Sequence, residues 1–132
     1  EESLMSFIEM WKQNSAFRNE RSKDVKFGFY DEDTNQVEFN EDMEVNVFKM
    51  YCGEYTQKDW DGIFKIGKTT IKKGRDLQLI ENEWRTVQPN LAVLNCNEEY
   101  GYGGEIMGGS SMNFIFARKD GKWYLIGFSA AG

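Results

Sequence analysis

The residues of this chain that could carry chemistry are its carboxylates, its tyrosines and two cysteines, because the sequence of 132 residues contains no histidine. Without imidazole, the chain lacks the usual general base near neutral pH and the most common metal ligand. Cys52 and Cys96 stand too far apart in the sequence for a zinc site, whose ligands are more numerous and closely spaced. We therefore predict no catalytic residue, no metal site and no cofactor from these motifs.

Carboxylate chemistry remains an alternative. A carboxyl group that is desolvated inside a fold has a raised pKa and can act as a base. Glu38, Glu44 and Asp76 lie near predicted strands and could face inward. Because the chain carries 22 acidic residues and such residues are mostly exposed, a surface position is the preferred interpretation for all three.

An acidic turn also follows the spacing of calcium-loop ligands, with Asp31, Asp33, Asn35 and Asp42 at the ligand positions. Gln36 stands where a calcium loop needs glycine for its sharp turn, and the last ligand is aspartate rather than glutamate. We therefore interpret this segment as an acidic turn between two strands.

A set of aromatic residues lies outside the clearest core positions and is the candidate ligand-binding surface. Exposed Trp and Tyr beside a glycine-rich loop can bind a small ligand or a glycan, and residues 101–109 form such a glycine-rich segment. The candidates are Tyr51, Trp60, Trp84, Tyr100 and Tyr102. The alternative for the two tryptophans is that they complete the core, since Trp is usually largely buried.

The two cysteines allow one disulfide bond. An oxidising compartment would permit a bridge between Cys52 and Cys96 if their geometry were suitable. The other interpretation is that both are buried thiols that act as small apolar residues.

The net charge of −6 disfavours binding to nucleic acid, which needs clustered positive charge, and to anionic lipid. No apolar run approaches the roughly 20 residues that cross a bilayer. The first residue is Glu1 rather than Met, so we expect that a signal peptide or lipid anchor has been removed.

The pattern along the chain changes from helical to strand-like at Val25. A helix is predicted after Ser3, a residue type that favours the N-cap position, with a second short helix over residues 15–21 capped by Ser15. Strands are predicted over residues 25–30, 36–39, 44–51, 76–80 and 91–96. The glycine-rich segment is expected to be a mobile loop or a bulged strand.

The C-terminal segment 114–128 predicts a β-hairpin around the turn Asp120-Gly121. A two-residue turn would pair Phe114 with Gly127 and would place Phe128 on the face opposite Phe114. Both faces of the hairpin are then largely apolar, so we expect it in the middle of a sheet with material packed on each side.

This hairpin, preceded by one helical segment and a run of strands, resembles the nuclear-transport-factor-2-like (cystatin-like) superfamily. Its members wrap a curved antiparallel sheet around an N-terminal helix, and their final strands often carry the aromatic, charged-turn and Lys-Trp pattern of residues 114–126. The resemblance implies one α+β domain over residues 1–132, with N-terminal helices packed on a curved antiparallel sheet. The superfamily includes isomerases and dehydratases that use an inward Asp or Tyr.

Residues 7–11, 14–21 and 25–27 are also similar to a family of uncharacterised proteins secreted by gut-dwelling Gram-negative bacteria. The Asp-Ser-x-Phe-Gln-x-x-Arg pattern of that family has Asn14 in place of Asp and Arg18 in place of Gln here, and the Pro-Leu that follows its first strand is missing. The resemblance implies a periplasmic, outer-membrane-anchored or secreted protein, and no established activity.

We predict from these features a non-catalytic domain that binds a small molecule, a glycan or a protein partner through the open end of its sheet. The first alternative is a small-substrate enzyme that uses an inward carboxylate or tyrosine. The second is a module that forms homodimers through an apolar sheet face.

Overall fold

The described residues, 1–44 and 46–132 of a computed structural model, form an α+β fold, which confirms the α+β part of the predicted fold class. The helices are α1 (Leu4–Gln13), α2 (Ser15–Glu20), α3 (Asn46–Cys52) and α4 (Gln57–Ile63). The strands are β1 (Lys26–Asp31), β2 (Gln36–Glu44), β3 (Gly67–Lys73), β4 (Asp76–Gln88), β5 (Leu91–Tyr102), β6 (Glu105–Lys119) and β7 (Lys122–Ala131).

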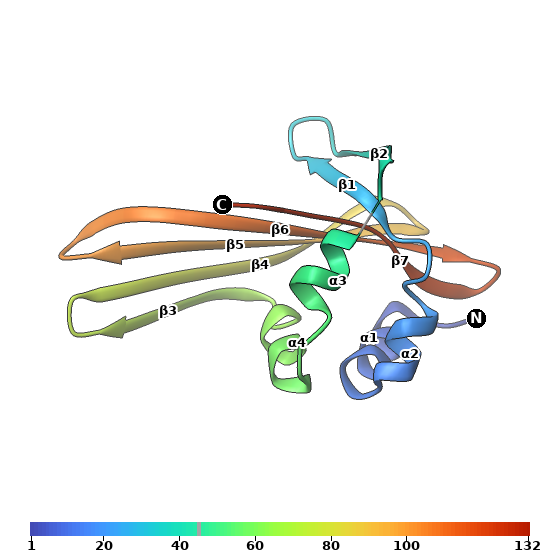
Figure 1. The fold of residues 1–132 in the computed structure, drawn as a ribbon, viewed down its shortest axis with the longest axis horizontal. Coiled ribbons are helices and arrows are strands. Elements are labelled where there is room, and N and C mark those ends of the chain that lie inside the picture. The colour runs from blue at the N-terminus through green and yellow to red at the C-terminus, as the bar shows by residue number, and fades with distance from the viewer. Residues whose placement is uncertain (45) are drawn as a thin grey trace.

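These strands form one sheet in the order β2-β1-β7-β6-β5-β4-β3. Neighbouring strands are antiparallel except β1 and β7, which pair in parallel, so the sheet is mixed rather than antiparallel throughout. The helices lie on one side of the sheet and the β1–β2 hairpin rises on the other (Figure 1).

Helix α1 begins where the sequence predicts it. Ser3 is the N-cap, and its side chain accepts a hydrogen bond from a backbone N–H of the first turn. Phe7 and Trp11, which are one helical turn apart, are fully buried on the face that meets the sheet. The next helix, α2, is capped by Asn14 rather than by Ser15, since the Asn14 side chain accepts from the first turn of α2.

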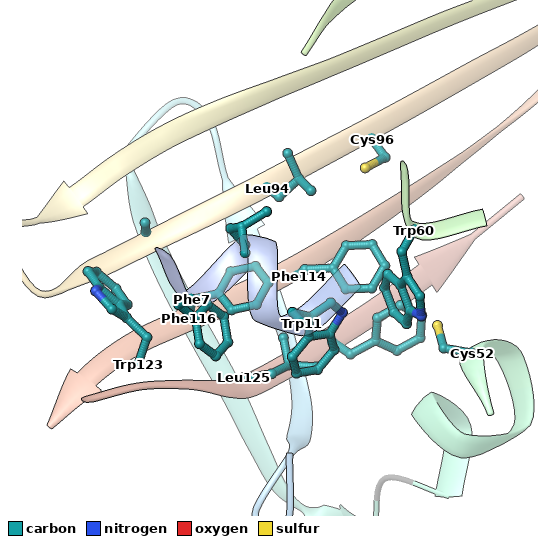
Figure 2. Packing of buried hydrophobic residues seen from close by; sticks show 13 residues of the cluster. Phe7, Trp11, Cys52, Trp60, Leu94, Cys96, Phe114, Phe116, Trp123 and Leu125 are labelled. Atoms are coloured by element: carbon teal, nitrogen blue, oxygen red, sulfur yellow. The ribbon is translucent and has the colours of Figure 1, made fainter. Parts of the chain in front are cut away.

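An aromatic cluster fills the space between the helices and the sheet (Figure 2). The ring of Trp11 lies at its centre, with its centroid 5.7 Å from Phe7, 5.3 Å from Trp60 and 6.2 Å from Phe116. The contacts to Trp60 and Phe116 are edge-to-face, which is a favourable geometry for aromatic pairs. The helices are therefore held on the sheet mainly by interlocking rings.

The opposite face of the sheet is covered by the β1–β2 hairpin. Ile115 of β6 is fully buried there, close to the ring of Phe39 from β2 and to Gly127 of β7. An ion pair of 3.2 Å between Glu32 and Arg85 ties the turn of the hairpin to β4. The prediction that the C-terminal hairpin lies mid-sheet with material on both sides is therefore confirmed.

The pairing of β6 with β7 follows the predicted register only near the turn. Phe116 pairs with Leu125, as a two-residue turn at Asp120-Gly121 requires, but a bulge then shifts the register, so Phe114 pairs with Phe128 rather than with Gly127. The extra residue turns Phe128 onto the helix side of the sheet, where its ring lies 5.2 Å from Phe114. The prediction that Phe128 faces away from Phe114 was wrong for this reason.

The predicted strand over residues 44–51 is also wrong for the part that the structure describes, because residues 46–52 form helix α3. Phe48 and Cys52 are four residues apart, so a helix brings both to one face. The ring of Phe48 packs 5.6 Å from Phe128, and Cys52 joins the core cluster. Val45 lies outside the described residues.

The glycine-rich segment is a strand hairpin rather than a loop. Strands β5 and β6 run through it and turn at Gly103 and Gly104, which have φ angles of 60° and 89° that favour glycine. The register shifts between Tyr100 and Gly101, so the bulged-strand alternative describes this segment. Strands β3 to β6 thereby extend well beyond the helices as an arm (Figure 1).

Phe39 of β2 packs close to Gly127, so adding a methyl group at Gly127 should destabilise the fold. A Cβ there would lie 2.8 Å from Phe39 Cε1 and 3.1 Å from the buried Ile115 Cβ. We expect Gly127→Ala to lower the free energy of unfolding by about 1–3 kcal/mol, as overpacking usually does. Urea denaturation followed by circular dichroism measures this change.

Gly108→Ala is the matched control, because a Cβ at Gly108 meets nothing within 4 Å. It should change the free energy of unfolding by less than about 0.5 kcal/mol. Equal stability of the Gly127→Ala variant and the unchanged protein would show that Phe39 does not pack on this face.

Candidate functional site

A hollow opens on the helix side of the sheet, where α4 ends and β4, β5 and β6 continue into the arm. Its volume is about 380 Å³, within the range of small-ligand sites. Apolar and polar side chains share its lining. The residues are Lys58, Asp59, Gly62 and Ile63 from α4, Ile80 and Asn82 from β4, Cys96, Asn97 and Glu98 from β5, and Ser110, Ser111 and Met112 from β6.

Helix α4 forms one wall of the hollow and is fixed at both ends. At its start, Thr56 and Asp59 form a capping box, in which the Thr56 backbone N–H donates to Asp59 Oδ2 at 2.8 Å. Hydrogen bonds from Thr56 lower the pKa of Asp59. At its end, the buried Asn82 Nδ2 donates to the carbonyl oxygens of Gly62 and Lys65 at 3.0 and 3.1 Å. The sheet therefore sets the position of this wall directly.

A polar network marks the edge of the hollow that faces the arm. The half-buried carboxylate of Glu98 accepts a hydrogen bond from Gln78 Nε2. The phenol of Tyr100 lies beside Glu98 and Ser110, and its interaction with the Glu98 carboxylate raises the pKa of the phenol. Tyr100 is 46% exposed, so a large part of its ring meets solvent.

The structure places the five aromatic candidates in different surroundings. Trp60 is 1% exposed and belongs to the core, and the half-buried Trp84 packs against that core with its ring 5.7 Å from Phe116. Tyr51 lies exposed on α3, and Tyr102 lies exposed on the arm. Tyr100 is not part of the lining of the hollow, but it lies beside Glu98 and Ser110, which are.

Sequence reasoning missed Asn82, Glu98 and Ser110 as residues of the hollow. The position of Glu98 could have been predicted from the sequence. It stands between Cys96 and Tyr100 at the two-residue period of a strand and therefore shares their face. The positions of Asn82 and Ser110 could not be predicted in this way, since they lie opposite Cys96 and Glu98 through pairings between different strands.

The carboxylates proposed as inward-facing bases do not enter the core. Glu38 is exposed on β2 and Asp76 is exposed at the start of β4, while the side chain of Glu44 lies outside the described residues. Among the described residues, no Asp or Glu is buried.

Both cysteines are buried and carry free thiols, without the bridge that the sequence allows. Burial raises the pKa of Cys52 and of Cys96 to about 12. Tyr55, whose hydroxyl donates to Met112 Sδ at 4.0 Å, also has its pKa raised to about 12, chiefly by burial. At neutral pH these groups are protonated, so they contribute apolar packing and weak hydrogen bonds to the site.

Comparisons of the chain with protein-family models, with curated proteins and with solved structures find no match. Among the residues that the structure describes, no helix has the length and apolar character needed to cross a membrane.

The raised pKa values predict that the thiols resist alkylation in the folded protein. An unfolded thiol has a pKa near 8.5, so at that pH about half of the unfolded chains carry each thiolate, which is the reactive form. We expect iodoacetamide at pH 8.5 to label the native protein at least about a hundredfold more slowly than the urea-unfolded chain. Mass spectrometry of the labelled protein over time measures both rates.

The raised pKa values of the two thiols also predict how the free energy of unfolding changes with pH. Because the folded pKa values are raised, the stabilisation from protonated thiols is complete below about pH 8.5 and is lost as the pH rises toward 12. A variant with Cys52→Ala and Cys96→Ala should lose less stability over that interval. Rapid labelling of either native thiol would contradict its buried, protonated state.

Proposed function

We propose that this protein binds a small neutral ligand of sugar-like chemistry in the hollow beside α4. The observation that carries the proposal is the position of the Tyr100 phenol, which lies beside Glu98 and Ser110 of the lining with its ring partly exposed. A sugar presents C–H groups on one side, which pack on an aromatic ring, and hydroxyl groups around its rim, which bond to carboxylate and hydroxyl oxygens.

The charges of the hollow support a neutral ligand over an anion. Asp59 and Glu98 contribute carboxylates, and Lys58 is the one cationic residue in the lining. A ligand hydroxyl can donate to either carboxylate, whereas an anion would be repelled by both. Ile80 and Met112 supply an apolar floor for the ring carbons of the ligand.

The hydrogen bonding of Glu98 and the protonation of Tyr55 and Tyr100 favour a binding function over a catalytic one. The carboxylate of Glu98 already accepts a hydrogen bond from Gln78 and interacts with the Tyr100 phenol. The phenols of Tyr55 and Tyr100 have raised pKa values, so they are donors at neutral pH rather than bases. An isomerase or dehydratase that uses an inward carboxylate or tyrosine remains the alternative function.

We also propose that the chain is a distant member of the nuclear-transport-factor-2-like, cystatin-like superfamily. The position of α1 against the sheet and the aromatic hairpin of β6 and β7 support this relation. The similarity of residues 7–11, 14–21 and 25–27 to secreted bacterial proteins supports a lipoprotein, periplasmic or secreted location.

A homodimer formed through the sheet is a second candidate. Exposed apolar side chains gather on the part of the arm that lies beyond the helices, and they favour such an interface. They are Ile71, Tyr102, Ile106 and Met107.

The sugar proposal predicts saturable binding that depends on Tyr100. We expect at least one member of a panel of glucose, galactose, N-acetylglucosamine and cellobiose to shift the NMR signals of Ile80 and Met112. Tyr100→Ala should weaken that binding at least tenfold, because losing an aromatic anchor costs about 2 kcal/mol and about 1.4 kcal/mol is a factor of ten. Glu98→Gln should also weaken it.

Tyr102→Ala is the matched control, since Tyr102 lies farther along β5 from Glu98 than Tyr100 does, beyond the register shift that follows Tyr100. It should leave the dissociation constant within twofold. The proposal fails if no sugar of the panel binds, or if the Tyr100 and Tyr102 variants bind equally well.

A further inference from the structure

A second opening, here called the helix cleft, lies between α2, α3 and α4 and has a volume of about 470 Å³. It shares no lining residue with the hollow beside α4. Six of its lining residues matter for its chemistry, and they are Arg18, Lys23, Phe48, Lys49, Tyr55 and Trp60. The cleft is therefore a separate candidate site.

The lining of the helix cleft is cationic, although the whole chain has a net charge of −6. Arg18, Lys23 and Lys49 line it, and no Asp or Glu does. Within the described part of the chain, none of these three cations forms an ion pair. The cleft therefore concentrates positive charge that the protein itself does not neutralise.

Arg18 is fixed in place at the base of the cleft. Its guanidinium donates to the carbonyl oxygens of Trp11 at 2.6 Å and Lys12 at 3.3 Å, and it lies 5.9 Å from the centre of the Trp60 ring. Burial lowers the pKa of Arg18, because its charge is partly desolvated. A bound anion would restore the solvation that this charge has lost.

The indole of Trp60 adds a donor without a partner. Trp60 is 1% exposed, and its buried Nε1–H has no hydrogen-bond acceptor within the structure. Figure 2 draws this nitrogen on the side of the ring toward Cys52, which also lines the cleft. The indoles of Trp11 and Trp123 are also unpaired, but of the three residues only Trp60 lines the helix cleft, so its donor is the one that a ligand in the cleft could pair.

We infer that the helix cleft binds a small aromatic anion whose head group is a carboxylate or a phosphate. An oxygen of the head group accepts from the Trp60 indole and lies beside the Arg18 guanidinium. The exposed Lys23 and Lys49 attract the anion at the rim. The half-buried rings of Phe48 and Tyr55 pack against its apolar body.

The test is a titration of the full chain with phenyl phosphate, benzoate and the neutral benzyl alcohol. The indole N–H signal of Trp60 is followed by ¹⁵N NMR. We expect a saturable shift with at least one of the two anions and none with benzyl alcohol, and the stronger anion identifies the head group. The double variant Lys23→Gln/Lys49→Gln should weaken binding at least tenfold.

The double variant Lys72→Gln/Lys73→Gln is the control, because it removes the same charge from β3, away from the helix cleft. It should leave the affinity within twofold. The inference is overturned if neither anion shifts the Trp60 signal, if benzyl alcohol binds as tightly, or if both double variants weaken binding equally. None of these outcomes depends on whether the hollow binds a sugar.

Discussion

The packing of Trp11 against Trp60 and Phe116 is the constraint on which the rest of this structure depends. Trp11 comes from the first helix, Trp60 from the fourth and Phe116 from the centre of the sheet, so their edge-to-face contacts join the helical layer to the strands. All three side chains are 0–1% exposed. Because rings fill the interior, the space left for a ligand lies at the margins of the cluster, in the hollow and in the helix cleft.

Helix α4 separates these two openings and gives them different chemistry. Its Gly62 and Ile63 border the hollow, while its Trp60 borders the helix cleft. Carboxylates of Asp59 and Glu98 lie on one side, and the cations of Arg18, Lys23 and Lys49 lie on the other. The hydrogen bonds from Asn82 to the end of α4 fix the helix to the sheet, so both openings keep their shape through the same attachment.

Local signals in the sequence predicted helix α1 and the turn of the C-terminal hairpin, because a cap residue and an Asp-Gly turn act within a few residues. Helix α3 was missed, since alternating Val45 and Val47 favour a strand and the contact of Phe48 with Phe128 decides otherwise. The hollow could be predicted only in part. Tyr100 stands next to a glycine-rich segment, but its position beside Ser110 depends on how β5 pairs with β6.

The central claim is that the aromatic cluster closes the interior and leaves ligand binding to its margins. Intermolecular nuclear Overhauser effects between a bound sugar and selectively labelled protein test this most directly. The account predicts effects from the sugar to the Tyr100 ring and the Met112 methyl group, and none to Trp11 or Phe116. Effects to Trp11 or Phe116, or a bound sugar that gives none to Tyr100, would contradict it.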